Sequence, residues 1–271
     1  MSYVGRDSDI VQLAATCEGK MPFNVYILPN KVISPGASNI HHLTVTGGQL
    51  FHRGCLVTSK TTQEALEEFL EWLDCNSVLV AHNGKSFDSI ILYHHICHCS
   101  LSDSFSSKVL GFSDTLPIFR KAYPQFSSHS IEYLVNNLLH RSPDDAHNAV
   151  DDVKNLQELV IKSQITWPNI QEFSFPITYT AQKCQISANR VTHMPSLSLL
   201  VSKKVISKGM SRKIAGSGLG LSHLITTYKR HGPDGVICLL SEKKEKKPRV
   251  TSNKKILNSI NEWLCTETNK K

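Results

Sequence analysis

The chain has 271 residues, of which 40% are hydrophobic and 20% charged. This ordinary globular composition excludes collagen-like, coiled-coil and wholly disordered chains. No apolar run is long enough to span a bilayer, so we expect no membrane partner. The amino end lacks the apolar core of a secretory signal, and the eight cysteines are therefore expected to be free thiols in an intracellular compartment, nucleus or cytoplasm.

The net charge of +7 is distributed unevenly along the chain. Residues 1–200 carry 14 Lys and Arg against 18 Asp and Glu, whereas residues 201–271 carry 16 against 5. This asymmetry predicts two units, the second suited to a polyanion such as nucleic acid. A solvated, lysine-rich tail is the alternative interpretation.

In chain order, the apolar runs Ile10–Thr16 and Phe23–Leu28 predict a β-hairpin, and a loop is expected up to about residue 50. The capping box Thr61–Glu64 predicts a helix with an apolar stripe. The run Ser77–Ala81 is typical of a buried strand.

Strands and helices continue to alternate after this point, which predicts an α/β unit with parallel strands. The expected elements are a helix over Phe87–Cys97, a strand near Gly111–Thr115, a helix from Ser130 to His140, and a helix that Asp144 or Asp145 opens and that runs to about Ile161.

The periodicity fades after about residue 165 and returns near residue 201. We therefore predict an α/β domain at residues 1–165, a linker with some extended structure at 166–200, and a small, basic, all-α module at 201–271.

Two segments carry side chains suited to catalysis. The first follows the predicted strand and contains His82, Asn83, Phe87 and Asp88. The second, at the start of a predicted helix, contains His147, Ala149 and Asp152. His147 and Asp152 are five residues apart and would lie on neighbouring faces of a helix, so we expect them to flank one cleft.

These segments resemble the motifs H-N-x-x-x-F-D and H-x-A-x-x-D of the DEDDh branch of the DnaQ-like 3′–5′ exonucleases. The resemblance covers about residues 1–162 and includes the step Asp114-Thr115-Leu116. It implies that the predicted domain at residues 1–165 is exonuclease-like. It implies an RNase H-like mixed sheet flanked by helices, and nucleic acid, DNA or RNA, as the substrate.

The resemblance also implies roles for these residues. Asp88 and Asp152 would be catalytic ligands of Mg²⁺ or Mn²⁺ in a two-metal site, and His147 would take the proton from the attacking water. Asn83 and Phe87 would contact the nucleic acid. The alternative, in which Asp88 and Asp145 cap helices and His147 is a surface residue, leaves the joint pattern unexplained.

The first motif of that family, D-x-E on the first strand, is missing from the printed sequence. Asp7-Ser8-Asp9 has the same alternation but is expected in a turn. Either the sequence is an N-terminally truncated, impaired form of a longer exonuclease, or it is a catalytically inactive relative that binds nucleic acid or acts as a scaffold. Because the strand is central in the family, its absence is expected to expose backbone edges and open a gap in the core.

The basic module is expected to contact a phosphate backbone. It also looks like the tail attached to some animal exonuclease-like proteins, including relatives of the promyelocytic leukaemia protein, a resemblance that assigns no chemistry. The basic pairs along it are Lys203-Lys204, Arg212-Lys213, Lys229-Arg230 and Lys254-Lys255.

Histidines and cysteines crowd one short stretch of the chain and form i,i+4 pairs of the kind that bind zinc. Partly buried faces of a helix are the commoner use of such residues. The residues are His94, His95, Cys97, His98 and Cys99.

Overall fold

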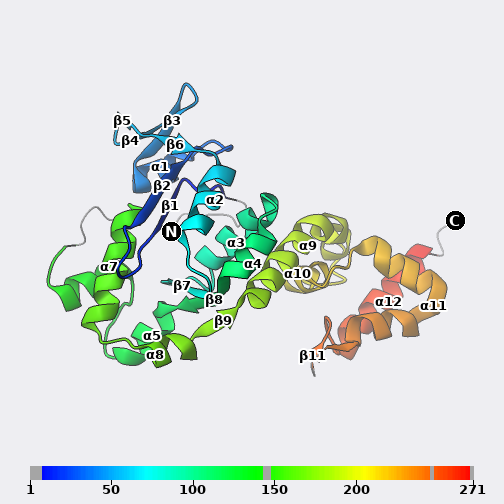
Figure 1. Ribbon diagram of the computed structural model, residues 1–271. Coiled ribbons are helices and arrows are strands. Elements are labelled where there is room, and N and C mark those ends of the chain that lie inside the picture. The colour runs from blue at the N-terminus through cyan, green and yellow to red at the C-terminus, as the bar shows by residue number, and fades with distance from the viewer. Residues whose placement is uncertain (1–7, 143–147, 245–246, 269–271) are drawn as a thin grey trace. The chain divides into compact units, whose positions relative to one another are not determined.

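The computed structural model describes residues 8–142, 148–244 and 247–268. The chain divides into two compact units, Met1–Ala181 and Gln182–Lys271. The first unit mixes strands and helices, whereas the described part of the second is helical apart from one two-stranded ribbon (Figure 1). No helix among the described residues is long and apolar enough to cross a membrane.

The predicted hairpin is confirmed and belongs to a small mixed sheet. Strand β1 (Gln12–Ala15) pairs antiparallel with β2 (Phe23–Ile27), with Gln12 opposite Tyr26. Strand β2 also pairs in parallel with β6 (Ser59–Lys60). The order β1-β2-β6 places β1 at one edge of this sheet.

A second mixed sheet contains the predicted strand at residues 77–81. Strand β7 (Ser77–Ala81) pairs in parallel with β8 (Val109–Asp114), and β8 pairs antiparallel with β9 (Ser174–Pro176). The order β7-β8-β9 places β7 at an edge. The unit is thus a mixed α/β unit with small mixed sheets, whereas the single mixed sheet of an RNase H-like fold stays a prediction.

The loop expected up to residue 50 is wrong, because this region contains regular elements. Helix α1 (Pro35–His41) begins after Ser34, whose hydroxyl accepts the N–H of Ala37. An antiparallel sheet of three short strands follows: β3 (Leu43–Thr46), β4 (Gln49–His52) and β5 (Cys55–Leu56). The tight turn at Gly47-Gly48, where both residues have positive φ, joins β3 to β4.

The helices of the first unit agree with the main sequence expectations. Helix α2 (Thr62–Trp72) has the predicted capping box of Thr61 and Glu64 and buries its apolar stripe. The others are α3 (Asp88–His98), α4 (Ser102–Lys108), α5 (Thr115–Ala122), α6 (Ile131–Leu134) with the π-helical turn Val135–Leu139, α7 (Ala149–Lys162) and α8 (Trp167–Glu172).

The predicted cap of α7 and the predicted burial of β7 differ from what the structure shows or lie outside the described residues. The Asn148 side chain caps α7 by accepting the N–H of Val150, whereas Asp144 and Asp145 lie outside the described residues. Strand β7 has the apolar sequence of a buried strand, yet none of its residues is buried and Val80 is 37% exposed. Among the strands that the structure describes, β7 lies at the edge of its sheet, where strands are less covered than at the centre.

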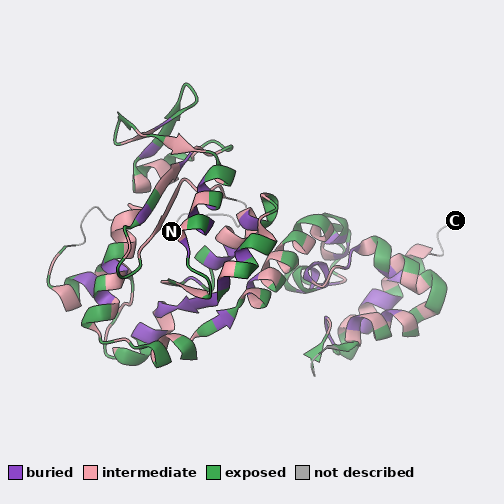
Figure 2. Ribbon diagram, in the orientation of Figure 1, coloured by how far each residue is buried: buried purple, intermediate pink, exposed green. Residues whose placement is uncertain are grey.

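The core of the first unit consists of two clusters rather than one. One cluster forms around Leu66, Phe69 and Phe105, and the other around Phe119 and Leu159. Strand β1 contains no buried residue, and Figure 2 accordingly shows it without the purple of buried segments. The strands at the two sheet edges are therefore the poorly covered elements of this unit.

The segment 166–200, expected as a linker with some extended structure, is largely helical. Helix α8 and strand β9 are followed by α9 (Ile177–Ser202), in which the unit boundary falls. The sequence pattern concealed α9 because Pro195 lies inside it and polar residues interrupt its apolar face. Leu197 and Leu200 are completely buried, so tertiary packing stabilises this helix.

The second unit has its own helical core. Its apolar centre includes Ile214, Leu224, Leu240 and Ile260. Its further elements are α10 (Lys208–Gly216), α11 (Leu221–Ser241), the ribbon β10 (Lys243–Lys244) with β11 (Lys247–Pro248), and α12 (Lys254–Thr268).

Candidate active site

The first functional segment begins where two parallel strands end together. Ala81, the last residue of β7, lies opposite Asp114, the last residue of β8. Parallel strands bring their carboxyl ends to the same edge of a sheet, so the residues after β7 and β8 meet there. The loop from His82 to Phe87 is therefore held next to Asp114.

Asp114 anchors this loop through backbone hydrogen bonds. Its carboxylate is 5% exposed and accepts the N–H groups of Asn83 (2.9 Å), Lys85 (3.1 Å) and Leu116 (2.9 Å). Charge-assisted bonds of this kind satisfy a buried carboxylate and fix the loop geometry. The sequence assigned Asp114 no such function, although its position before a helix is a recognisable capping signal.

The loop conformation depends on two residues with special backbone requirements. Asn83 has φ of 59°, in the left-handed region that Asn tolerates better than most residues. A Cβ atom on Gly84 would lie 2.8 Å from the Ala81 Cβ, so only glycine fits without a shift. Asn83 is solvent-exposed at the tip of this turn, consistent with its expected contact with a substrate.

Hydrogen bonds from both ring nitrogens fix the orientation of His82, the first residue of the loop. Its Nε2 is 2.7 Å from the His129 carbonyl oxygen and its Nδ1 is 2.9 Å from the Thr115 hydroxyl. Nε2–H must donate to the carbonyl, so Nδ1 accepts from Thr115 in the neutral ring. Burial lowers the pKa of His82, against the opposing effect of the carbonyl acceptor. The residue therefore supports the loop as a neutral imidazole.

Phe87 and Asp88 stand at the start of α3 and line a cavity of about 720 Å³. Phe87 is 41% exposed. Asp88 is an exposed residue, yet desolvation by the surrounding protein atoms, and then the charges of Asp114 and Asp152, raise its pKa to about 6. Asp88 therefore carries a proton more readily than an ordinary aspartate.

Asp152 reaches the same cavity from the first turn of α7. Its charge is the smallest of the effects that raise the pKa of Asp88, after burial and the charge of Asp114. Asp88 and Asp152 thus line the same cavity, and their catalytic and metal-binding roles stay a prediction. His147, the third member of the predicted set, lies outside the described residues.

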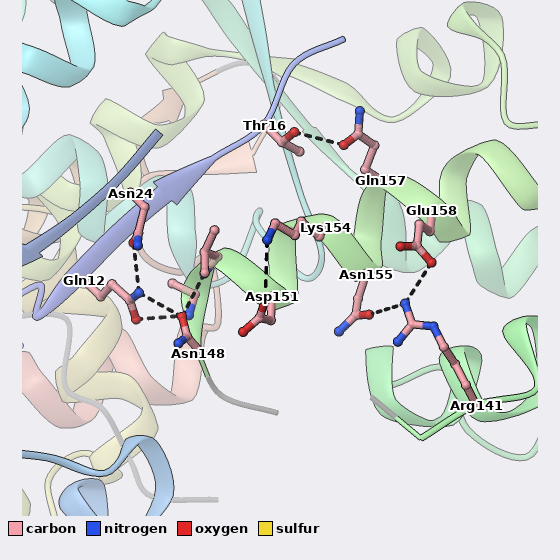
Figure 3. A network of polar contacts seen from close by, with 12 residues as sticks. Gln12, Thr16, Asn24, Arg141, Asn148, Asp151, Lys154, Asn155, Gln157 and Glu158 are labelled. Carbon is pink, nitrogen blue, oxygen red and sulfur yellow. Dashed lines mark hydrogen bonds and ion pairs between the residues drawn. The ribbon is translucent and has the colours of Figure 1, made fainter. Parts of the chain in front are cut away.

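Polar contacts link α7, the helix that carries Asp152, to β1 and the residue after it (Figure 3). Gln12 donates to the Asn148 Oδ1 at 2.9 Å and accepts the Ala149 N–H at 3.1 Å. Two turns further along α7, Thr16 donates to the Gln157 Oε1 at 2.9 Å. These bonds link the helix that carries Asp152 to an edge strand.

The metal expectations are met only in part. Among the residues that the structure describes, no group of three or more His, Cys, Asp or Glu side chains could hold a metal ion. This finding covers the histidine stretch of α3, where the His94 and His98 rings lie 4.5 Å apart and His95 Nε2 is 3.0 Å from the Ser8 carbonyl oxygen. The Asp9 Oδ2 accepts the Lys31 N–H at 2.8 Å, whereas Asp7 lies outside the described residues.

The predicted basic residues are all exposed in the second unit. Exposure leaves their charges available to a ligand but does not identify one. They are Lys203, Lys204, Arg212, Lys213, Lys229, Arg230, Lys254 and Lys255.

Comparison with known protein families gives two separate matches. Residues 193–267 match the family described as PML, C-terminal domain, in agreement with the resemblance of the basic module. No curated protein matches the chain. Residues 10–160 match the Exonuclease family, RNase_T. Since that match spans more than half of the chain, the protein belongs to the Exonuclease family.

Proposed function

We propose that the first unit is a metal-dependent 3′–5′ exonuclease unit, acting on DNA or RNA, whose described residues provide only part of the catalytic set. The observation that carries the proposal is the convergence of Asp88 and Asp152 on one cavity, beside the exposed Asn83 and Phe87. Membership of the Exonuclease family supports a nucleic-acid substrate.

The chemistry explains why two carboxylates are insufficient. Hydrolysis of a phosphodiester requires an activated water and stabilisation of the charge that develops on the phosphate, which divalent ions supply when bound. Mg²⁺ and Mn²⁺ prefer carboxylate oxygens, and Asp88 and Asp152 are suited to contribute them. However, the described residues contain no group of three metal-binding side chains, so the pair does not by itself fit a two-metal site.

The protonation of Asp88 adds to this difficulty. A carboxyl group with a pKa of about 6 holds a proton over part of the pH range in which it would bind a cation. A bound cation would have to displace that proton. His147, immediately before the cap of α7 in the sequence, is proposed to act as the general base.

An activity assay with 5′-labelled oligonucleotides tests the proposal. We expect the chain as printed to shorten 3′ ends little or not at all in Mg²⁺ or Mn²⁺. A chain extended at its amino end by a strand that carries D-x-E is expected to be active, and His147→Ala or Asp152→Asn should then lower the rate by about a hundredfold or more.

Asp151→Asn is the matched control for Asp152→Asn. Asp151 lies one residue away on the same turn, but its Oδ1 is 3.8 Å from Lys154 Nζ and it does not line the cavity. The control should retain most of the activity of the extended chain. An extended chain that folds and remains inactive would refute the exonuclease proposal.

The second candidate function is that of an inactive exonuclease-like protein that binds nucleic acid or acts as a scaffold. It is favoured by the lack of a D-x-E motif in the printed sequence. Calorimetry and the activity assay together distinguish the two candidates. A non-catalytic protein should bind oligonucleotides without Mg²⁺. Adding the D-x-E extension to it should increase neither its affinity for Mg²⁺ nor its activity.

We also propose that the second unit holds nucleic acid through its exposed basic pairs. The charge balance of residues 201–271 supports this, with 16 Lys and Arg against 5 Asp and Glu. Only two aromatic residues, Tyr228 and Trp263, lie in this segment, so stacking on bases should be minor and sequence preference weak.

A further inference from the structure

Lys85, in the middle of the loop between β7 and α3, holds its ammonium group over two aromatic rings. Its Nζ lies 4.8 Å from the centre of the Tyr179 ring and 5.3 Å from that of the Phe175 ring. Phe175 is on β9 and Tyr179 is in the first turn of α9, within the first unit. Because the face of an aromatic ring attracts a cation, these two rings fix the position of the Lys85 charge.

The surface beneath the ammonium group belongs to the core of the unit. Phe175 is 6% exposed, and its ring stacks on that of Phe112 with 5.7 Å between the ring centres. At the other end of the residue, the Lys85 N–H donates to the Asp114 carboxylate at 3.1 Å. Since both the backbone and the charged end of Lys85 are held in the free protein, a ligand that binds the ammonium group has little motion left to restrict, which favours affinity.

Lys85 differs from the other lysines that lie over aromatic rings. Among the described residues there are two of these, and each also pairs with a carboxylate: Lys20 with Asp74 at 2.6 Å and Lys121 with Glu172 at 2.7 Å. Within the same part of the chain, no carboxylate pairs with Lys85. Its charge is thus held in place without being neutralised, an arrangement that suits an anionic ligand from outside the protein.

The location of Lys85 restricts which part of a ligand it can bind. Lys85 is exposed, like Asn83 and Phe87 of the same loop, so an external ligand can reach it. Phe87 and Asp88 line the cavity that Asp152 also borders, whereas Lys85 does not. The Lys85 charge therefore lies beside the cavity and outside it.

We propose that Lys85 binds a phosphate of the nucleic-acid backbone other than the one attacked between Asp88 and Asp152, an inference that rests on the proposed function of the first unit. Residues 1–200 carry 14 Lys and Arg against 18 Asp and Glu, so this part of the chain repels a polyanion. A fixed cation at the site loop offsets that repulsion and places the strand next to the cavity. A phosphate contact of this kind adds affinity for any sequence and specifies none.

Binding of a labelled oligothymidylate to the full chain, without divalent ions and at several salt concentrations, tests the inference by fluorescence anisotropy. Lys85→Met keeps an unbranched apolar side chain over the rings but removes the charge. We expect it to lower the affinity about three- to tenfold at low salt and to reduce the salt slope by about 0.7. Lys85→Arg, which keeps the charge and stacks on aromatic rings, should retain most of the affinity. Lys121→Met is the matched control and should leave the slope unchanged, because Glu172 already neutralises this lysine.

Carbon-13 NMR of the lysine methylene groups locates the contact in the unaltered chain, where the second unit is also proposed to bind nucleic acid. The oligothymidylate should shift the signal of Lys85, which its absence in Lys85→Met identifies, and should leave that of Lys121 in place. Inorganic phosphate at the same phosphate concentration should shift the Lys85 signal little. An equal shift by inorganic phosphate would show a site for free anions and would overturn the assignment to the nucleic-acid backbone.

A purely structural use of Lys85 gives a different set of results. If Lys85→Arg lost as much affinity as Lys85→Met, and the Asn83 amide exchanged faster in both, the residue would only support the loop and the inference would be overturned. In a catalytically active extended chain, Lys85→Met should raise KM by about three- to tenfold and leave kcat nearly unchanged.

These measurements separate the inference from the proposed function, because binding does not require catalysis. An oligonucleotide shift at Lys85 together with an inactive extended chain would support the phosphate contact and refute the exonuclease. An active extended chain in which Lys85→Met altered neither the salt slope nor KM would overturn the inference alone. The inference also fails if the oligonucleotide leaves the Lys85 signal unmoved.

Discussion

Gln12 on β1 holds the first turn of α7 with both atoms of its side-chain amide, donating to Asn148 at 2.9 Å and accepting from Ala149 at 3.1 Å. Asn148 uses the same oxygen to cap α7 at Val150. The helix that carries Asp152 is thereby tied to β1 by side-chain bonds. Side-chain hydrogen bonds thus connect an edge strand to the start of a helix that is far away in the sequence (Figure 3).

Gln12→Ala should destabilise the protein, because it removes both bonds and leaves the Asn148 oxygen and the Ala149 N–H with fewer partners. We expect a loss of about 1–3 kcal/mol in the free energy of unfolding, measured with urea. Gln63→Ala is the control, since Gln63 bonds to Glu67 on the exposed face of α2. Equal stabilities of the two variants would contradict the importance of this clamp.

Asp114→Asn should disorder the loop between β7 and α3. An amide has one oxygen where the carboxylate has two, so its NH₂ group would face a backbone N–H that Asp114 now accepts. We expect a loss of about 2–4 kcal/mol in stability, as for hydrogen bonds to a charged group, with faster amide exchange at Asn83 and Lys85. Asp103→Asn, on exposed α4, should change neither quantity appreciably.

Asp88 should titrate near pH 6 when its carboxyl carbon is followed by NMR. Asp152→Asn should lower this pKa, but only partly, because the surrounding protein atoms contribute more to the shift than the Asp152 charge. A pKa near the ordinary value of 3.8 in the unaltered chain would show that the two carboxylates do not share an environment.

The raised pKa of Asp88 also predicts the direction in which stability changes with pH. The folded state binds this proton more tightly than the unfolded state, so stability contributed by Asp88 falls as pH rises from 3.8 to about 6. Asp88→Asn should remove this contribution and flatten the profile in that window. Urea unfolding at several pH values measures the difference between the two profiles, and parallel profiles would contradict the prediction.

His82 should make stability depend on pH in the opposite direction. Its pKa is lowered from 6.5 in the folded state, chiefly by burial, so the unfolded state binds the proton more tightly. Stability is then lost as pH falls through 6.5 and below. His82→Gln should reduce this acid sensitivity, although the loss of the contacts to Thr115 and His129 lowers stability at every pH. An unchanged slope would show that His82 is not buried as a neutral ring.

The basic pairs should make nucleic-acid binding strongly dependent on salt. The logarithm of the affinity should fall by about 0.7 to 0.9 per log unit of salt for each phosphate neutralised. Replacing Lys229 and Arg230 by Ala should reduce the slope by about 1 to 2, as measured by fluorescence anisotropy with the full chain. Lys121→Ala, which breaks an ion pair with Glu172 in the first unit, is the control. A full chain that binds no oligonucleotide at low salt would refute this function of the second unit.

The tertiary structure decided how the chain is divided and what surrounds its site. The helical character of residues 177–202 rests on the burial of Leu197 and Leu200 in a core built from distant helices, which no local pattern encodes. The position of α7 depends on Gln12, more than a hundred residues away in sequence. The Asp114 carboxylate accepts three backbone N–H groups, and these come together only because the loop after β7, the end of β8 and the start of α5 meet in the folded chain.

The sequence alone determined the elements whose signals are local. The capping box at Thr61 fixed the start of α2, and the hairpin and the strand at Ser77–Ala81 followed from apolar runs between turns. The spacing of Asp88 and Asp152 within two motifs led to the expectation of a shared cleft, and both residues line one cavity. It did not determine that β7 would be half-exposed at the edge of a cavity, because the burial of a strand depends on which other strands pair beside it. Helix caps and periodicity are properties of neighbouring residues, whereas sheet edges and cavities are properties of the whole assembled unit.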